Sequence, residues 1–312
     1  MGRFFSLLIV VILSMHTLTA QENTVTTNAI KQHVYKLAKD IGERNTSHPQ
    51  ALHQAEGYIK KTWQTMGYTV QSQTYEVNGV HSANLEVTIP GSQKAEEIIL
   101  VGAHYDSARG TPGANDNASG VAAILELSRL FIASSPQRTI RFVAFVNEES
   151  PYFFTANMGS MRYAKMAHSR GDDIRLMLAL ETIGYYRDET GTQEYPPLFR
   201  YFYPSSGNFI AFVSNLKSRH QLKQLTKAFR QYSDFPSERI ATFSWIPGVA
   251  ESDHVSFWWR HYRAVMVTDT AFYRYPYYHS KEDTPEKLDY ERLTAVTTGL
   301  YDALSHLLQH GL

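Results

Sequence analysis

Cysteine is absent from all 312 residues, and 30 basic side chains balance 30 acidic ones, so the formal net charge is zero. The lack of cysteine excludes a disulfide-built scaffold and leaves no cysteine for a lipid anchor. The lack of a basic excess argues against nucleic-acid binding, because neutralisation of phosphates supplies most non-specific affinity. Repeats, low-complexity tracts and charge runs are also absent. With 43 % hydrophobic residues, the chain can bury a large core.

Residues 1–20 have the features of a secretory signal peptide. Arg3 gives a positive start, residues 4–15 are an apolar segment, and a small-residue cleavage sequence follows at 18–20. The apolar segment is short for a membrane span of about 20 residues, which favours cleavage over a retained anchor helix. We therefore expect an exported protein, periplasmic or extracellular, without a stable membrane anchor. The length of the mature chain, 21–312, favours one large α/β domain.

Hydrophobic periodicity predicts an alternation of strands and helices. Apolar residues at helical spacing predict helices at 29–41, 49–66, 119–134, 158–167, 222–231, 253–259 and 285–310. Alternating or continuous apolar runs predict strands at 69–77, 83–89, 98–103, 140–146, 174–180, 199–202, 209–213 and 264–268. This order predicts a three-layer α/β/α fold with a mixed, mainly parallel sheet. Asn78-Gly79 between the first two strands predicts an antiparallel hairpin at one edge.

Polar side chains follow the buried strands at the places where each strand ends, or precede a predicted helix. Seven of them are acidic or imidazole groups: His104, Asp106, Asp116, Glu148, Glu149, Glu181 and His279. Each alone has an ordinary structural explanation as a turn former, helix cap or solvated loop residue. Because sites in such sheets lie at the carboxyl ends of the strands, we expect these side chains to converge. Crowded carboxylates need compensating cations, and histidine with carboxylate but no thiolate is typical of catalytic zinc.

The sequence resembles the co-catalytic di-zinc aminopeptidases, family twenty-eight of the metallopeptidases, in the superfamily of aminopeptidases, glutaminyl cyclases and glutamate carboxypeptidases. Six segments carry the resemblance: GAHYDS at 102–107, PGANDNASGVAAILELSR at 112–129, RFVAFVNEE at 141–149, LALETIGYY at 178–186, SDHVSFW at 252–258 and YHSKEDTPEKLDY at 278–290. They follow the order and approximate spacing of the family. The resemblance is strongest over 95–290, and it implies a single zinc-dependent exopeptidase domain.

The resemblance implies a site for two zinc ions. Asp116 matches the carboxylate that binds both metals. His104 and Glu181 match the other ligands of one zinc ion, and Glu149 and His279 match those of the second. Such an arrangement leaves positions open for water at both metals.

Three further positions need comment. Many relatives have aspartate where this chain has Glu181, but a small backbone shift absorbs the extra methylene, and carboxylates of either length bind zinc. The resemblance implies a cis peptide bond between Asp116 and Asn117. Asp253 and His254 either support the site or cap a helix.

The resemblance also implies the catalytic roles. Glu148 matches the general base that takes a proton from water held between the metals, and Tyr278 matches the residue that hydrogen-bonds the developing oxyanion. Asp106 matches the carboxylate behind the histidine ligand of the first zinc. The implied function is a zinc-dependent aminopeptidase that hydrolyses N-terminal bonds of a peptide substrate.

Two other functions stay open. A glutaminyl-peptide cyclotransferase has a similar scaffold, but such enzymes commonly use one zinc and have tryptophan where this chain has Tyr278, and the turn at 115–117 resembles the peptidases. A catalytically silent binding module on the same fold is disfavoured, because all the acidic and imidazole positions are retained. Side-chain preference, carboxypeptidase action and oligomeric state stay open as well.

Overall fold

The computed structural model describes residues 24–312, so the predicted signal peptide at 1–20 lies outside the described residues. One eight-stranded sheet has the strand order β1-β2-β4-β3-β5-β8-β6-β7. The bounds of its strands are β1 Gln71–Val77, β2 Val80–Ile89, β3 Lys94–His104, β4 Arg138–Phe145, β5 Asp173–Glu181, β6 Ile210–Asn215, β7 Ser237–Thr242 and β8 Ala264–Thr268. The pairs β1·β2, β2·β4 and β6·β8 are antiparallel. The remaining pairs are parallel, which confirms the mixed, mainly parallel sheet with an edge hairpin.

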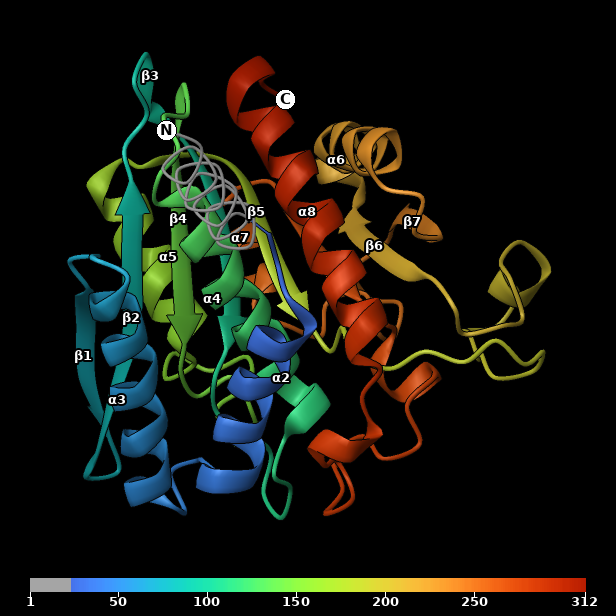
Figure 1. Cartoon of the computed structure of the whole chain (residues 1–312), viewed down its shortest axis with the longest axis horizontal. Coiled ribbons are helices and arrows are strands. Elements are labelled where there is room, and N and C mark those ends of the chain that lie inside the picture. The colour runs from blue at the N-terminus through green and yellow to red at the C-terminus, as the bar shows by residue number, and fades with distance from the viewer. Residues whose placement is uncertain (1–23) are drawn as a thin grey trace, which may run out of the picture.

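Helices cover both faces of this sheet (Figure 1). Their bounds are α2 Thr27–Tyr35, α3 Pro49–Thr65, α4 Gly120–Phe131, α5 Gly159–Arg170, α6 Arg219–Tyr232, α7 His254–Trp258 and α8 Tyr290–His310. Residues of α2, α3, α4, α6 and α8 belong to the larger apolar core, and residues of α5 and α7 belong to the core on the other face. The three-layer α/β/α prediction is therefore confirmed. Among residues 24–312, no helix is both long and apolar enough to cross a membrane.

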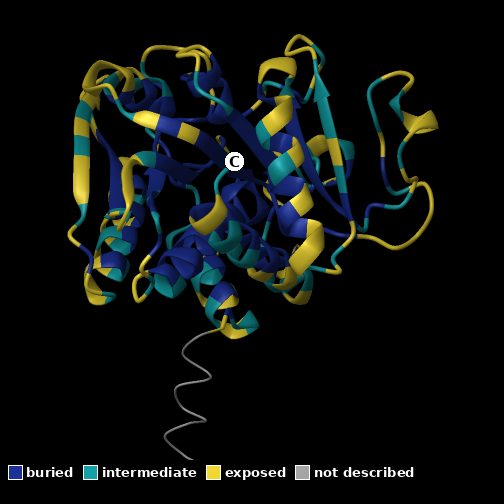
Figure 2. Ribbon diagram, turned by 90° about the horizontal axis from the view of Figure 1, so that it is seen from above, coloured by how far each residue is buried: buried dark blue, intermediate teal, exposed yellow. Residues whose placement is uncertain are grey.

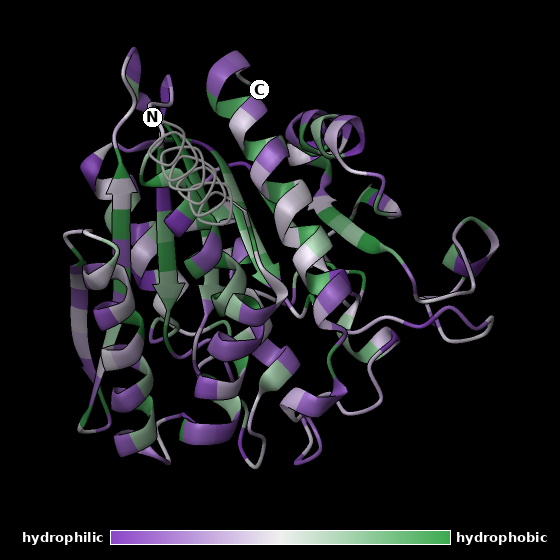
Figure 3. Ribbon diagram, viewed as in Figure 1, coloured by the Kyte–Doolittle hydropathy of each residue, from purple (hydrophilic) through white to green (hydrophobic). Residues whose placement is uncertain are grey.

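The inner parts of the central strands β3, β4 and β5 are mostly apolar and buried, because helices cover both faces of the sheet there (Figures 2 and 3). Ile99 of β3 packs in the larger core, whereas its neighbour Ile98 packs in the core under α5 and α7. At Gly102, nearer the carboxyl end of β3, an added Cβ would lie 2.3 Å from the ring of Phe145 on β4. The close packing of β3 against β4 therefore requires glycine at this position.

Two strands differ from the prediction. The strand predicted at 199–202 is wrong: Phe199–Tyr201 form a short 3-10 turn, and Phe202 is 79 % exposed. This segment projects from the sheet between β5 and β6, on the right of Figure 1, so its aromatic run has no neighbouring strand to pair with. Conversely, β7 was missed, because its sequence SERIAT has no apolar run and lies at a sheet edge.

The helix predicted at 285–310 consists of two pieces. A single 3-10 turn, Pro285–Lys287, comes first, and Leu288 and Asp289 then have extended ψ angles of 145° and 92°. The side chain of Asp289 accepts a hydrogen bond of 3.0 Å from the backbone N–H of Arg292. Asp289 is therefore the N-cap of α8, and the helix begins at Tyr290 instead of continuing from the 3-10 turn.

Candidate metal centre

The five side chains expected to bind metal come together at the carboxyl edge of the sheet. β3 ends at His104 and its parallel neighbour β5 ends at Glu181, so both strands deliver their last side chains to the same edge. Glu149 follows β4, whereas Asp116 lies in the turn Ala114–Ser119 and His279 in the loop before α8. Three groups of side chains have ligand-type atoms within 4.8 Å of one another: His104, Asp116 and Glu181; His104, Glu148 and Glu149; and Asp116, Glu149 and His279.

Asp116 lies between two imidazoles. Its Oδ1 is 3.2 Å from Nε2 of His104, and its Oδ2 is 3.0 Å from Nε2 of His279. Oε2 of Glu181 lies 3.3 Å from the first imidazole, and Oε2 of Glu149 lies 3.3 Å from the second. The result is two adjoining groups that share one carboxylate. The His279 side chain is 42 % exposed, whereas that of Asp116 is 3 % exposed, so the centre opens to solvent on the His279 side.

Several buried polar atoms of this cluster lack hydrogen-bond partners within residues 24–312. They include Nε2 of His104, Oδ1 of Asp116 and Oε1 of Glu149. Leaving such atoms unpaired in the interior costs free energy, and native structures rarely do so. A cation between them would interact favourably with all three, because each presents a lone pair when the imidazole is neutral. The donor set and its unpaired atoms therefore fit divalent metal.

The electrostatics of the centre point the same way. Burial raises the pKa of Glu148 well above its ordinary value, and burial together with the charge of Asp116 raises the pKa of Glu149 to about 7. Burial opposes ionisation of Asp116 as well, but the adjacent imidazoles of His104 and His279, when protonated, lower its pKa. Burial lowers the pKa of His279, yet the two facing carboxylates raise it to about 10. The acids therefore ionise together only when positive charge accompanies them.

Asp106 supports two parts of the centre. Its Oδ1 lies 3.5 Å from Nδ1 of His104, on the side of the ring away from Asp116. The same carboxylate accepts hydrogen bonds of 3.1 Å from the backbone N–H groups of Glu148 and Glu149. Neighbouring side chains of a strand point to opposite faces of the sheet. Because β4 ends at Phe145, Glu148 and Glu149 lie beyond the strand, and both of their side chains can approach His104. Asp106 therefore positions the imidazole and the two-glutamate loop together.

The two predicted catalytic side chains lie at the rim of this cluster. Oε2 of Glu148 is 3.9 Å from Nε2 of His104, and the residue is 7 % exposed. The Tyr278 ring stacks on the imidazole of His279 with centroids 3.9 Å apart. Burial and the neighbouring carboxylates raise the pKa of Tyr278 well above its ordinary value. Its hydroxyl therefore keeps its proton and can donate a hydrogen bond.

The segment Ser252-Asp253-His254 lies next to the centre, and its three side chains differ in their contacts. The hydroxyl of Ser252 donates a 2.8 Å hydrogen bond to Oε2 of Glu181. Asp253 is buried at the start of α7, and its side chain makes no capping hydrogen bond. Burial raises its pKa to about 7, opposed by the charge of His104. His254 points elsewhere and donates from Nε2 to the carbonyl oxygen of Val249 at 2.8 Å.

Arg44 binds the backbone of the segment between His104 and Asp116, and the sequence analysis did not identify it. It is fully buried and donates hydrogen bonds to the carbonyl oxygens of Tyr105, Pro112 and Gly113. Burial lowers its pKa to about 10, whereas Asp106 and other acids of the centre raise it, so it carries a charge at neutral pH. A single arginine in a polar stretch, far upstream of the motifs, gives no signal in the sequence.

Two further acids hold the turn that carries Asp116. Asp283 accepts hydrogen bonds from the backbone N–H groups of Asn115 at 2.8 Å and Asp116 at 3.1 Å. Asp269 accepts from the amide side chain of Asn115 at 2.8 Å. Asp269 directly follows β8, so the strand-end argument that selected Glu181 also applies to it. The peptide bond between Asp116 and Asn117 is cis, as the resemblance implies.

Comparison with known sequences gives a family and several relatives. Residues 84–304 match the model of Peptidase family M28. The uncharacterized protein YfbL of Escherichia coli K12 is 35 % identical over 284 residues, which cover 88 % of this chain and 86 % of that protein. Aminopeptidase YwaD of Bacillus subtilis is 25 % identical over 225 residues, which cover 69 % of this chain and 43 % of that protein. The chain therefore spans less than half the length of YwaD.

Solved structures share the fold at low sequence identity. BSAP, a zinc aminopeptidase from Bacillus subtilis, superposes with a TM-score of 0.73 and 14 % identity, covering 92 % of this chain and 96 % of that chain. A glutaminyl cyclase from Bacteroides thetaiotaomicron superposes with a TM-score of 0.68 and 17 % identity, covering 90 % and 98 %. One architecture thus occurs in both a peptidase and a cyclase. From the match over 84–304 and the 35 % identical relative, the chain belongs to peptidase family M28.

Proposed function

We propose that this protein is an aminopeptidase that holds two zinc ions and hydrolyses N-terminal peptide bonds. The observation that carries the proposal is the position of Asp116 between two imidazoles, each with a second carboxylate beside it. Zinc bonds of about 2.0–2.1 Å in a tetrahedral site separate ligand atoms by about 3.3 Å. The four nitrogen–oxygen distances of 3.0–3.3 Å are close to that value. His104, Asp116 and Glu181 would hold one ion, and Asp116, Glu149 and His279 the other.

The chain's own groups supply the rest of the chemistry. When bound, the zinc ions would polarise the scissile carbonyl and lower the pKa of water. Glu148 lies next to the ligand cluster, and Asp106 fixes its backbone. Its carboxylate accepts the proton of the attacking water and passes it to the leaving amine. The protonated hydroxyl of Tyr278 donates a hydrogen bond to the carbonyl oxygen as negative charge develops there.

A second candidate function is glutaminyl-peptide cyclotransferase, which the similarity to the glutaminyl cyclase structure favours. The two complete ligand groups that share Asp116 favour the peptidase, as does the similarity to BSAP, a zinc aminopeptidase. We further propose that the protein is exported, on the evidence of residues 1–20 alone.

Zinc-loaded protein incubated with a peptide that begins with glutamine separates these functions. Release of free glutamine, measured by mass spectrometry, is the expected result. Formation of pyroglutamyl peptide with release of ammonia would establish the cyclase instead. An unchanged peptide, together with no hydrolysis of a panel of aminoacyl anilides, would contradict both enzymes.

A further inference from the structure

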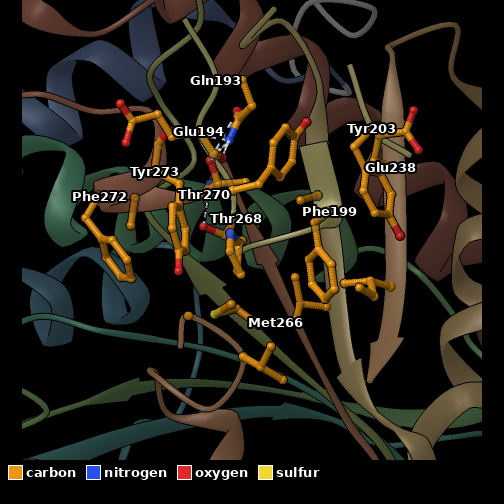
Figure 4. A pocket seen from close by; sticks show the side chains of 18 of the residues that line it. Gln193, Glu194, Phe199, Tyr203, Glu238, Met266, Thr268, Thr270, Phe272 and Tyr273 are labelled. Carbon is orange, nitrogen blue, oxygen red and sulfur yellow. Dashed lines mark hydrogen bonds between the residues drawn. The ribbon is translucent and has the colours of Figure 1, made fainter. Parts of the chain in front are cut away.

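An aromatic pocket adjoins the metal centre, and its lining includes Glu181 and Tyr278. Figure 4 shows part of this lining, including Phe199, Tyr203 and Glu238. Eight aromatic side chains line it, among them Tyr195, Phe199 and Tyr203 of the projecting segment. The pocket extends across the sheet from β5 over β8 and β6 to β7. A residue bound at the metal centre therefore has its side chain next to this space.

One row of residues across the sheet lies beneath the pocket. Glu181 pairs with Thr268, Thr268 with Ala211, and Ala211 with Glu238. Residues paired in this way place their side chains on the same face of a sheet. Two small side chains thus lie between two carboxylates. Neighbouring strands are about 4.8 Å apart, so the backbones of Glu181 and Glu238 are separated by about 14 Å.

The charges that face the pocket are acidic. Its lining includes Glu194, Glu238 and Glu251 in addition to Glu181, and Arg239 is the one cationic side chain among the described lining residues. Arg239 donates from Nη1 to the hydroxyl of Thr226 on α6, at 2.9 Å. Because strand neighbours point to opposite faces, this guanidinium and the Glu238 carboxylate lie on different sides of β7. The described lining therefore carries four acids and one cationic side chain, and that cation is engaged with α6.

Glu238 is the half-buried acid at the far end of the row. It makes no ion pair with any side chain in the described part of the chain, and Tyr203 lies beside it (Figure 4). Burial raises the pKa of its carboxyl, and the more distant charge of Arg230 only partly opposes this effect. An approaching cation would stabilise the carboxylate, whereas an apolar ligand would remove more water and leave it unpaired.

We propose that this pocket selects a basic side chain, lysine or arginine, on the N-terminal residue of the substrate, and that Glu238 pairs with its cation. The inference rests on the proposed aminopeptidase function. The four-carbon stem of lysine carries its ammonium about 6 Å from Cα. A charge-assisted hydrogen bond of about 2.8 Å from the ammonium to the Glu238 carboxylate then covers much of the remaining distance. The apolar stem packs against the aromatic walls, which also attract the cation through their π faces. Leucine is shorter and stops before Glu238.

Matched substrates test this inference. Lysyl and norleucyl 4-nitroanilides share a stem and differ in the terminal ammonium. We expect the zinc-loaded protein to have a kcat/KM for the lysyl substrate at least about tenfold above that for the norleucyl one. Glu238→Gln keeps the shape and removes the charge, so the ratio of the two values should fall by about tenfold. Glu76→Gln, on the opposite edge strand β1, removes an equal charge and should leave the ratio unchanged.

Binding of free amino acids gives a readout independent of turnover. Calorimetry on the zinc-loaded protein should show L-lysine binding more tightly than L-norleucine, with the difference lost in Glu238→Gln. Equal binding of the two amino acids to the wild type, or a substrate ratio that Glu238→Gln does not change, would overturn the basic-side-chain inference and leave the aminopeptidase intact. Failure to cleave any anilide would overturn the proposed function itself. If Glu238→Gln does not fold, the wild-type comparison of the two amino acids decides.

Discussion

The turn that carries Asp116 is held by many hydrogen bonds, whereas the segment that projects beside the adjoining pocket exposes several of its side chains to solvent. Asn115, Asp116 and Asn117 are at most 2 % exposed, and Arg44 and Asp283 bind the backbone around them. In the projecting segment between β5 and β6, by contrast, Leu198, Tyr201 and Phe202 are 68 %, 69 % and 79 % exposed. Metal-dependent chemistry needs fixed ligand positions, while selection of a side chain tolerates walls that adjust.

The same contrast appears in how charge is balanced. Around the ligand cluster, acids face the imidazoles of His104 and His279, and Arg44 lies close behind. In the pocket, Glu238 has no ion-pair partner among the described residues, and the partner that we propose for it is the cation of the substrate side chain. The charged groups of the metal centre thus have most of their partners before substrate arrives. In the proposed function, Glu238 of the pocket gains its partner only when substrate binds.

The largest effect is expected from Glu148→Gln at the rim of the rigid region. The amide has nearly the same shape but cannot accept the water proton, so kcat should fall by about 10²–10⁴. Zinc content, measured by atomic emission, should stay at the wild-type value because Glu148 is not among the proposed ligands. Activity close to that of the wild type would remove Glu148 as the base.

Arg44→Met tests how much the ties around the turn contribute to folding. The substitution leaves buried carbonyl oxygens of Tyr105, Pro112 and Gly113 without their donor. We expect the free energy of unfolding in urea to fall by about 3 kcal/mol. The control is Arg187→Met, which breaks an exposed pair with Glu189 and should leave the urea unfolding midpoint close to that of the wild type. Equal effects of the two substitutions would refute the role given to Arg44.

His254 lies on α7 and donates a hydrogen bond to the carbonyl oxygen of the pocket residue Val249. Burial lowers its pKa from 6.5 to about 4, so the folded protein holds it neutral where the unfolded chain protonates it. Its contribution to stability is therefore complete above pH 6.5 and is lost as the pH falls towards 4. Between pH 7 and pH 5 the loss should be about 2 kcal/mol.

The measurement is urea unfolding of chelator-treated protein at both pH values, for the wild type and His254→Gln. The glutamine amide can still donate to Val249 but does not titrate, so its variant should lose about 2 kcal/mol less on acidification. Parallel stability curves for the two proteins would show that the imidazole is not held neutral by burial.

The smallest effect is expected in the projecting segment. Phe202→Ser replaces a side chain that is 79 % exposed, so the free energy of unfolding should change by less than about 0.5 kcal/mol. A loss of several kcal/mol in urea unfolding would mean that the projecting segment is packed against something and that the contrast between the two regions does not hold.

Strand ends made most of the centre predictable from the sequence. His104, Glu149 and Glu181 follow or end buried apolar runs, and the topology of a parallel sheet brings such positions together. The same argument could have selected Asp269 after β8. Arg44 could not be found, because it bonds to backbone carbonyls, which leave no pattern in side-chain types.

The pocket was less accessible to sequence reasoning. β7 is a polar edge strand, so nothing in its sequence distinguished Glu238 from a surface acid. The aromatic run at 199–202 imitated a strand because apolar spacing alone does not tell whether a neighbouring strand is present to pair with. Both errors lie in the region whose structure depends on partners rather than on its own periodicity.

Anomalous X-ray diffraction from crystals of zinc-loaded protein would show whether Asp116 joins two metal sites. Two peaks are expected at the zinc edge, one among His104, Asp116 and Glu181 and the other among Asp116, Glu149 and His279. A centre without peaks, or with peaks away from these side chains, would contradict this expectation.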